Sequence, residues 1–106
     1  MRTIKKDKDF RGKGGVYKIL QIICSNCGVE IMLYQKDGRG TIHRAYLNRI
    51  LAPENLASLQ DNITSQDQLK AIICECGNMI AKPMKHREGR IAFWLALGAY
   101  KKQIYK

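Results

Sequence analysis

Four cysteines are the residues of this chain whose types and spacing are best suited to chemistry. They form two pairs, Cys24-Ser25-Asn26-Cys27 and Cys74-Glu75-Cys76, with 46 residues between the pairs. Each pair follows two isoleucines and precedes a glycine, so the two segments look like a weak internal duplication. Paired cysteines at such spacing in a cytosolic protein bind a metal ion more often than they form disulfides. The two pairs could therefore supply four thiolates to one ion.

The local geometry of each pair favours the same chemistry. A strand that runs into Cys-x-x-Cys-Gly makes a tight turn, a knuckle, in which both sulfurs point to one side and the glycine lets backbone amides approach them. Two knuckles can enclose Zn²⁺ as a tetrahedron, with Zn–S distances of about 2.3 Å. The sequence thus predicts one zinc ion held by Cys24, Cys27, Cys74 and Cys76. Four thiolates leave no open position for water, so the predicted role of the metal is structural.

The two pairs and their flanking strands resemble the zinc-ribbon family, and the whole sequence is similar to small uncharacterised prokaryotic zinc-ribbon proteins. The resemblance implies two knuckles around one ion and implies no activity. Two features depart from the family pattern: the second pair is one residue shorter than usual, and simple ribbons have about 15 to 20 residues between the pairs. His86 or water could replace one ligand, or Cys74 or Cys76 could be only a small buried side chain.

Strands must position the two pairs. Residues 16–23 are rich in β-branched and apolar residues and lead into the first pair, and residues 29–34 alternate as a half-buried strand does. A turn at residues 36–40, which contain Asp-Gly, follows. Residues 41–51 fit a helix or a strand, and we favour a strand in the first half that completes a hairpin with 29–34. Pro53 opens a short helix.

The second half of the chain predicts a second strand, pair and hairpin. Residues 61–68 are a polar loop with capping-box spacing at its end, and residues 69–73 form the strand that enters the second pair. Residues 79–84 and 91–97 predict a hairpin. The expected fold is a β-rich α+β domain of zinc-ribbon type, over residues 16–106, with two cysteine knuckles, β-hairpins and a short helix in the insertion between them. Residues 1–15 are expected to be a flexible basic arm.

The net charge of +10 on 106 residues is unevenly distributed. Basic residues dominate segments 1–15, 36–49 and 82–106, whereas segment 50–81 is net acidic. Such a field attracts polyanions. The favoured partner is therefore nucleic acid, RNA or a ribonucleoprotein, and the alternatives are an acidic protein partner or simply a solvated basic surface. The residues expected to contact phosphate are Lys36, Arg39, Arg44, Lys85, Arg87 and Arg90.

Aromatic residues are interleaved with basic ones near the C-terminus. Exposed rings in such a setting can stack on bases, and this role stays open for Trp94, Tyr100 and Tyr105. Phe93 has a more apolar setting that favours a place in the core.

Enzymatic signatures are few in this sequence. It contains no serine elbow, no recognisable carboxylate pair and no Cys-His arrangement outside the cysteine pairs, so we expect a protein that is not an enzyme. A redox role for Cys24 and Cys27 is the main enzymatic alternative, although a helix would be expected after such a motif. The longest apolar run, residues 91–97, is too short to span a bilayer, and no secretory signal is evident. The expected location is the cytoplasm, with no membrane partner.

Overall fold

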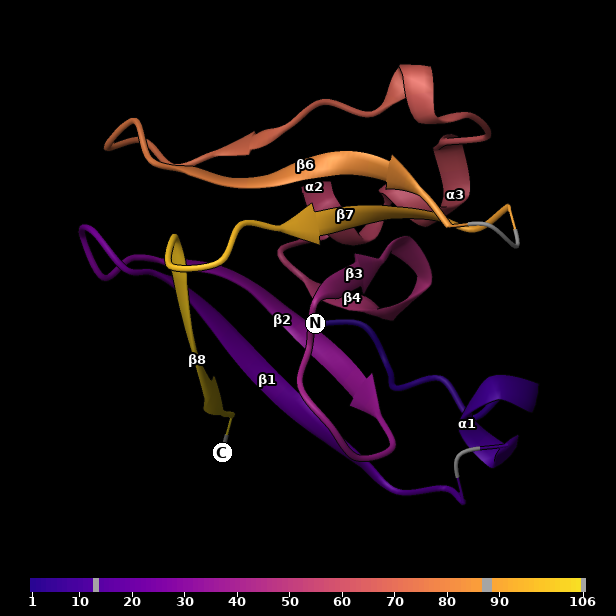
Figure 1. Cartoon of the computed structure of the whole chain (residues 1–106). Coiled ribbons are helices and arrows are strands. Elements are labelled where there is room, and N and C mark those ends of the chain that lie inside the picture. The colour runs from indigo at the N-terminus through magenta and orange to yellow at the C-terminus, as the bar shows by residue number, and fades with distance from the viewer. Residues whose placement is uncertain (13, 87–88, 106) are drawn as a thin grey trace.

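Two antiparallel sheets of four strands each form the framework of the domain (Figure 1). The structure is a computed structural model that describes residues 1–12, 14–86 and 89–105. Sheet A contains, in spatial order, β4 (Ile50–Ala52), β2 (Glu30–Asp37), β1 (Tyr17–Cys24) and β8 (Tyr100–Ile104). Sheet B contains β3 (Arg44–Tyr46), β7 (Ile91–Leu95), β6 (Met79–Lys85) and β5 (Ile72–Ile73). The short helical segments of the described residues are α1 (Lys8–Gly12), η1 (Leu47–Arg49), α2 (Glu54–Ala57), α3 (Leu59–Asn62) and η2 (Gln66–Gln68).

This arrangement confirms the predicted β-rich α+β class. The short helix after Pro53 is α2, and Ser65 and Gln68 form the capping box that their spacing predicted, around η2. The hairpin predicted for residues 79–84 and 91–97 is formed by β6 and β7. None of the helices in the described part of the chain has the length and apolar character that are needed to cross a membrane.

Each sheet supplies one cysteine pair in a turn between two antiparallel neighbours. The first pair lies between β1 and β2, and the second lies between β5 and β6. Figure 1 shows these two turns at the same end of the molecule, at the left of the view. The 46 residues between the pairs form β2 to β5 and all the short helices except α1, so the insertion builds parts of both sheets.

The chain crosses from one sheet to the other within residues 41–52, and at this point the predicted hairpin is wrong. β3 pairs with β7 in sheet B, whereas β4 pairs with β2 in sheet A, and η1 turns the chain between them. Ala45, Leu47 and Ile50 are all buried in the shared core although they belong to three different elements. The segment fits neither a helix nor one strand because its apolar residues serve two sheets.

The core lies between the two sheets. Ile22 and Met32 from sheet A and Ile80 and Phe93 from sheet B have no more than 1% of their surface exposed. The burial of Phe93 confirms the core position that its apolar setting favoured.

Strand β8 has no counterpart among the elements predicted from the sequence. It pairs with β1 at the edge of sheet A, and Tyr100 lies opposite Cys24. Its other side chains are exposed, so the strand has no buried apolar face and lacks the alternation by which strands are recognised. Backbone pairing with β1 places it in the sheet, and the Tyr100 hydroxyl, which donates to the Ile42 carbonyl at 3.2 Å, adds a side-chain contact at its start.

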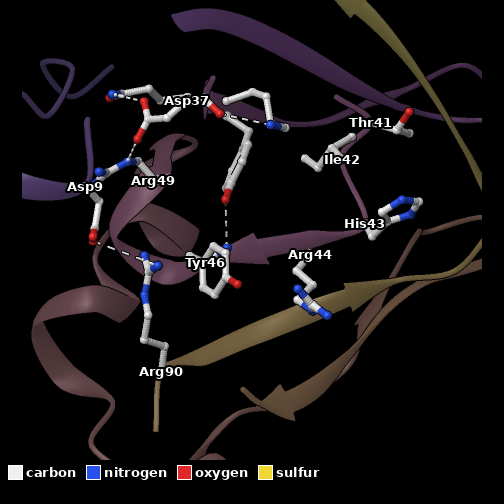
Figure 2. Close-up of a pocket in the computed structure, with 12 residues that line it drawn as sticks. Asp9, Asp37, Thr41, Ile42, His43, Arg44, Tyr46, Arg49 and Arg90 are labelled. Carbon is white, nitrogen blue, oxygen red and sulfur yellow. Dashed lines mark hydrogen bonds and ion pairs between the residues drawn. The ribbon is translucent and has the colours of Figure 1, made fainter. Parts of the chain in front are cut away.

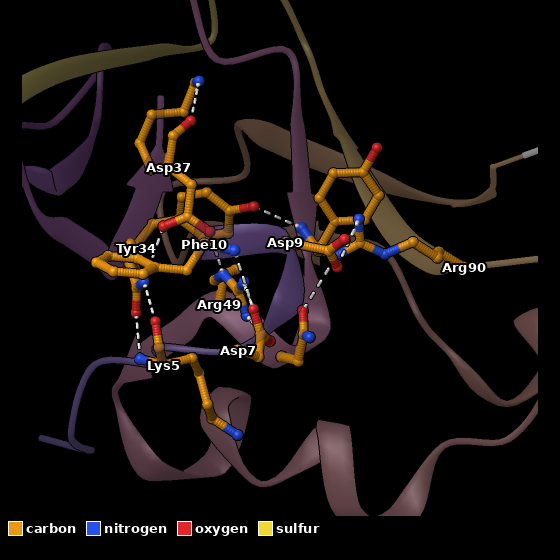
Figure 3. Close-up of polar contacts among 12 residues, drawn as sticks. Lys5, Asp7, Asp9, Phe10, Tyr34, Asp37, Arg49 and Arg90 are labelled. Carbon is orange, nitrogen blue, oxygen red and sulfur yellow. Dashed lines mark hydrogen bonds and ion pairs between the residues drawn. The ribbon is translucent and has the colours of Figure 1, made fainter. Parts of the chain in front are cut away.

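The structure also differs from the prediction of a flexible arm at the N-terminus. Residues 1–12 fold back against sheet A, with Phe10 of α1 buried and the Lys5 backbone bonded in both directions to the Gln35 side chain, at 2.6 and 2.8 Å. Figure 3 shows the polar contacts that hold this segment against the domain. Arg49 is only 3% exposed, and its guanidinium donates to both carboxylate oxygens of Asp7, at 3.0 and 2.7 Å, and to Asp37 at 2.7 Å.

A buried arginine requires carboxylate partners, because desolvating an unpaired charge costs several kcal/mol. Asp37 comes from sheet A, and Asp7 comes from the N-terminal segment, so the ion pairs join that segment to the domain. The hydrogen bonds from Arg49 also lower the pKa of Asp7 to about 2, from an ordinary value of 3.8. The N-terminal charges therefore take part in the fold.

We predict that Arg49→Met lowers the free energy of unfolding by about 3–5 kcal/mol, because it leaves the buried carboxylate of Asp37 without its cation. Arg2→Met is the matched control, since Arg2 pairs with the exposed carboxylates of Glu54 and Asp61 and should cost less than about 1 kcal/mol. Urea unfolding of both variants measures the difference. Equal, small losses in the two variants would show that the buried cluster does not hold the N-terminal segment.

Candidate metal centre

The sulfur atoms of all four cysteines converge at one point. The four Sγ atoms lie within 4.8 Å of one another. The Sγ atoms of Cys24 and Cys76 are 3.7 Å apart, and those of Cys27 and Cys74 are 3.4 Å apart. A tetrahedral ion with bonds of about 2.3 Å to sulfur requires sulfurs about 3.8 Å apart. The cluster therefore has the composition and nearly the dimensions of a four-thiolate metal site.

The two turns that carry the cysteines have closely related backbones. In the first turn the Gly28 amide donates to the Cys24 carbonyl at 2.9 Å, and in the second the Gly77 amide donates to the Cys74 carbonyl at 2.8 Å. Both glycines have positive φ, +79° and +95°, which other residues adopt only with strain. The hydrogen bond that closes the first turn joins residues four positions apart, whereas the bond that closes the second joins residues three positions apart. Cys-x-Cys-Gly thus forms a knuckle one residue shorter, and both of its sulfurs reach the cluster.

Hydrogen-bond donors lie beside the sulfurs of Cys24 and Cys76 and favour the thiolate form of these two residues. The Asn78 side chain donates to Cys24 Sγ at 3.4 Å and, together with two backbone amides, lowers the pKa of Cys24 to about 6. The Asn26 side chain donates to Cys76 Sγ, also at 3.4 Å, and lowers the pKa of Cys76. Although the Cys76 amide donates to Cys74, burial and the neighbouring thiols raise the pKa of Cys74 to about 12. The donors on Cys24 and Cys76 prepare those sulfurs to bind a cation.

A third segment, the connection from β7 to β8, also reaches the cluster. The Ser25 amide donates to the Ala99 carbonyl at 3.0 Å, and the Ser25 hydroxyl donates to the Gly98 carbonyl at 2.7 Å. The Asn78 amide group donates to Ala99 at 2.9 Å as well as to Cys24, since one NH₂ group has two hydrogens. Asn78 therefore links the two knuckles and this connection.

Sequence reasoning missed both Asn26 and Asn78. Asn26 lies inside the first pair and Asn78 directly follows the glycine of the second knuckle, and these positions are the only signal that could have indicated them.

The alternative ligand and the alternative redox site receive no support from this arrangement. His86 lies beside the ring of Tyr46, with 6.1 Å between the ring centroids, and is not part of the cysteine cluster. Cys27 is followed by strand β2 and not by a helix, so the helical context of a redox motif is missing. One cysteine of each pair, Cys24 and Cys74, is buried, and the other is exposed.

The basic residues expected to contact phosphate lie partly together. A hollow of about 200 Å³ lies between β2 of sheet A and β3 of sheet B, and it is also lined by Arg49 of η1 and by Arg90, which precedes β7. Figure 2 shows its lining residues. Three of the predicted residues line it, namely Lys36, Arg44 and Arg90. Arg44 also lines a second, adjoining hollow together with Lys85. Arg39 is exposed and lines neither hollow, and Arg87 lies outside the described residues.

Contacts within the first hollow hold several of its cations in place. The guanidinium of Arg90 lies over the ring of Tyr46, 3.8 Å from its centroid, and pairs with Asp9 at 3.9 Å. The Lys36 ammonium donates to the Asp37 carbonyl at 2.9 Å. Arg49 also lines this hollow, where it is held by its two carboxylates. The hollow is therefore basic and built from both sheets.

Comparisons with known proteins give no match, whether the chain is compared with protein-family models, with curated proteins or with solved structures. The assignment of the metal site therefore depends on the cysteine cluster itself.

We predict that Asn78→Ala weakens the binding of Zn²⁺ by about 10- to 100-fold, which is the usual effect of losing a group that positions metal ligands. Asn62→Ala, at the end of α3 and remote from the cluster, is the matched control and should bind as the unmodified chain does. Competition with a chromophoric chelator measures both affinities. Identical affinities in the two variants would show that Asn78 does not support the thiolates.

Proposed function

We propose that this chain is a non-enzymatic module that is stabilised by one structural zinc ion and binds nucleic acid, RNA in preference, through its basic hollows. The observation that carries the proposal is the convergence of four cysteine sulfurs from two separate sheets. Because four thiolates complete a tetrahedral shell, such an ion would have no position left for water or substrate. Its role would be to hold the two knuckles together.

The size of the chain supports a structural role for the metal. A domain of about 100 residues buries only some 60–70% of its unfolded surface, so a cross-link between its two sheets has a large effect on stability. Binding of zinc to thiolate sites contributes on the order of 10 kcal/mol to folding in small metal modules. Thiolates also suit iron, and elemental analysis with the colour of the purified protein distinguishes the two metals.

We predict that removing the metal with a strong chelator abolishes the folded state, because the metal–thiolate bonds that join the two knuckles, and the folding free energy that they contribute, are lost. Dispersion of the amide NMR signals should collapse, and adding Zn²⁺ should restore it. Cys27→Ser and Cys76→Ser, which change one exposed sulfur in each knuckle, should each lower the metal content below one ion per chain. A metal-free sample that keeps dispersed signals would overturn the structural role.

Charge and geometry support the nucleic-acid proposal. Carboxylates hold three basic residues of the described chain, since Arg2 pairs with Glu54 and Asp61, Arg49 pairs with Asp7 and Asp37, and Arg90 pairs with Asp9. The predicted phosphate contacts Lys36, Arg44, Lys85 and Arg90 line two adjoining hollows. Cations gathered along a hollow suit the closely spaced phosphates of a nucleic acid.

We predict that the double variant Arg44→Ala/Lys85→Ala weakens RNA binding and makes it less sensitive to salt. Each lost phosphate contact should reduce the slope of log affinity against log salt by about 0.7–0.9. Lys101→Ala/Lys102→Ala removes the same charge from β8, at the edge of sheet A, and should leave the slope nearly unchanged. Fluorescence anisotropy of labelled RNA at several salt concentrations gives the slopes.

Two results would contradict this proposal. Equal effects of the two double variants would show that only the total charge matters. If the folded, zinc-loaded protein binds neither RNA nor DNA at low salt, nucleic-acid binding is excluded, and an acidic protein partner becomes the better explanation of the basic surface.

A further inference from the structure

A tryptophan lies on the exposed face of sheet B between two basic residues. Trp94 of β7 is 45% exposed. The strand register places it opposite Arg44 of β3 on one side and opposite Lys82 of β6 on the other. All three side chains are exposed. We call these three residues the outer row.

The outer row lies on the face of the sheet that points away from the core. Residues directly opposite each other in antiparallel strands present their side chains on the same face, with Cβ atoms about 4.5–5.5 Å apart. The neighbouring cross-strand pair, Ala45 and Phe93, has the opposite orientation, and both residues are buried. Trp94 thus has a basic residue as its cross-strand neighbour on each side.

Among the described residues, none provides an aromatic or cationic partner for the indole of Trp94. The ring contacts and the cation–π contact of this part of the chain join other residues. Phe93 and Tyr34, aromatic residues of the two sheets, are almost fully buried, whereas Trp94 is not. The flat face of Trp94 is therefore available to a ligand.

A second flat, cationic group lies further along the same face. Tyr46 of β3 pairs with Ala92 of β7, two positions from Trp94, so it faces the same side of the sheet, about 7 Å along the strand. The guanidinium of Arg90 covers this ring at 3.8 Å. Arginine planes, like indole rings, can stack on bases. Arg44 belongs to the outer row and also lines both basic hollows, so one continuous surface joins them.

We propose that the outer row binds single-stranded RNA, with one base stacked on Trp94 and the adjacent phosphates held by Arg44 and Lys82. This inference rests on the proposed nucleic-acid function and specifies its substrate class. Base faces are accessible in single strands and hidden in a duplex, and exposed aromatic rings between cations on a sheet are suited to bind them. The chemistry is that of any unpaired polynucleotide, so RNA and DNA strands must be compared.

Trp94 is the single tryptophan of the chain, so intrinsic fluorescence reports directly on this site. The zinc-loaded protein is titrated with an oligouridylate of about ten nucleotides, a length within the site sizes of β-sheet domains that bind single strands. We expect saturable quenching of Trp94 fluorescence with this strand and none with an abasic strand of the same length and charge. A duplex RNA of equal length should quench little, and an oligothymidylate arm shows whether the 2′-hydroxyl is recognised.

Substitution of Trp94 tests the stacking independently of fluorescence. Measured by anisotropy of the labelled oligouridylate, Trp94→Leu should weaken binding by about 5- to 150-fold, whereas Trp94→Phe should keep most of the affinity. Leu97→Ala removes another exposed apolar side chain, in the β7–β8 connection, and should bind as the unmodified chain does. Circular dichroism of each variant checks that its fold is intact.

The outcomes separate this inference from the proposed function on which it rests. If the oligouridylate binds with normal salt dependence while Trp94→Leu binds equally well and Trp94 fluorescence is unchanged, the stacking site is excluded and the nucleic-acid function stands. If no nucleic acid binds the folded protein at low salt, both fail. Quenching by the abasic strand equal to that by the oligouridylate would also overturn base stacking.

Discussion

The meeting of four cysteine sulfurs at one end of the molecule is the constraint on which the rest of the structure depends. Each sheet contributes one knuckle to the cluster, and the connection from β7 to β8 is bonded to it through Ser25 and Asn78. A cation bound by all four sulfurs would join the two sheets through metal–thiolate bonds.

A second cluster, of charged side chains around Arg49, joins the N-terminal segment to β2 and η1, beside the first hollow. Because Arg49 is surrounded by Asp7 and Asp37, part of the basic charge of the chain is neutralised inside the fold. The cations of the hollows and of the outer face of sheet B are placed where a ligand can reach them. In the proposed function, the metal would stabilise the two-sheet framework and sheet B would carry the ligand. A net charge of +10 therefore says less about binding than the positions of a few arginines and lysines do.

Much of the fold could be predicted from local patterns. The strands that flank the cysteine pairs and the hairpin of β6 and β7 show the expected apolar residues, and the helix after Pro53 shows a start signal. Three parts could not be predicted: the division of residues 41–52 between two sheets, the edge strand β8 and the ordered N-terminal segment. In each of these the deciding interaction is with a residue distant in sequence. Apolar periodicity predicts which face of a helix or strand is buried, but it does not identify the element that packs against that face.

For the candidate sites, too, one part could be predicted from the sequence and another part could not. The sequence by itself determined the ligand chemistry, because cysteine pairs followed by Gly28 and Gly77 specify thiolates on tight turns whatever surrounds them. Only the tertiary structure decided that the two pairs meet, that Asn78 supports them, and that Trp94 faces solvent between two cations. The physical reason is that residue type and local spacing set the donor atoms and the turn. Convergence and exposure depend on strand pairing and register across tens of residues, and these are settled by the whole core at once.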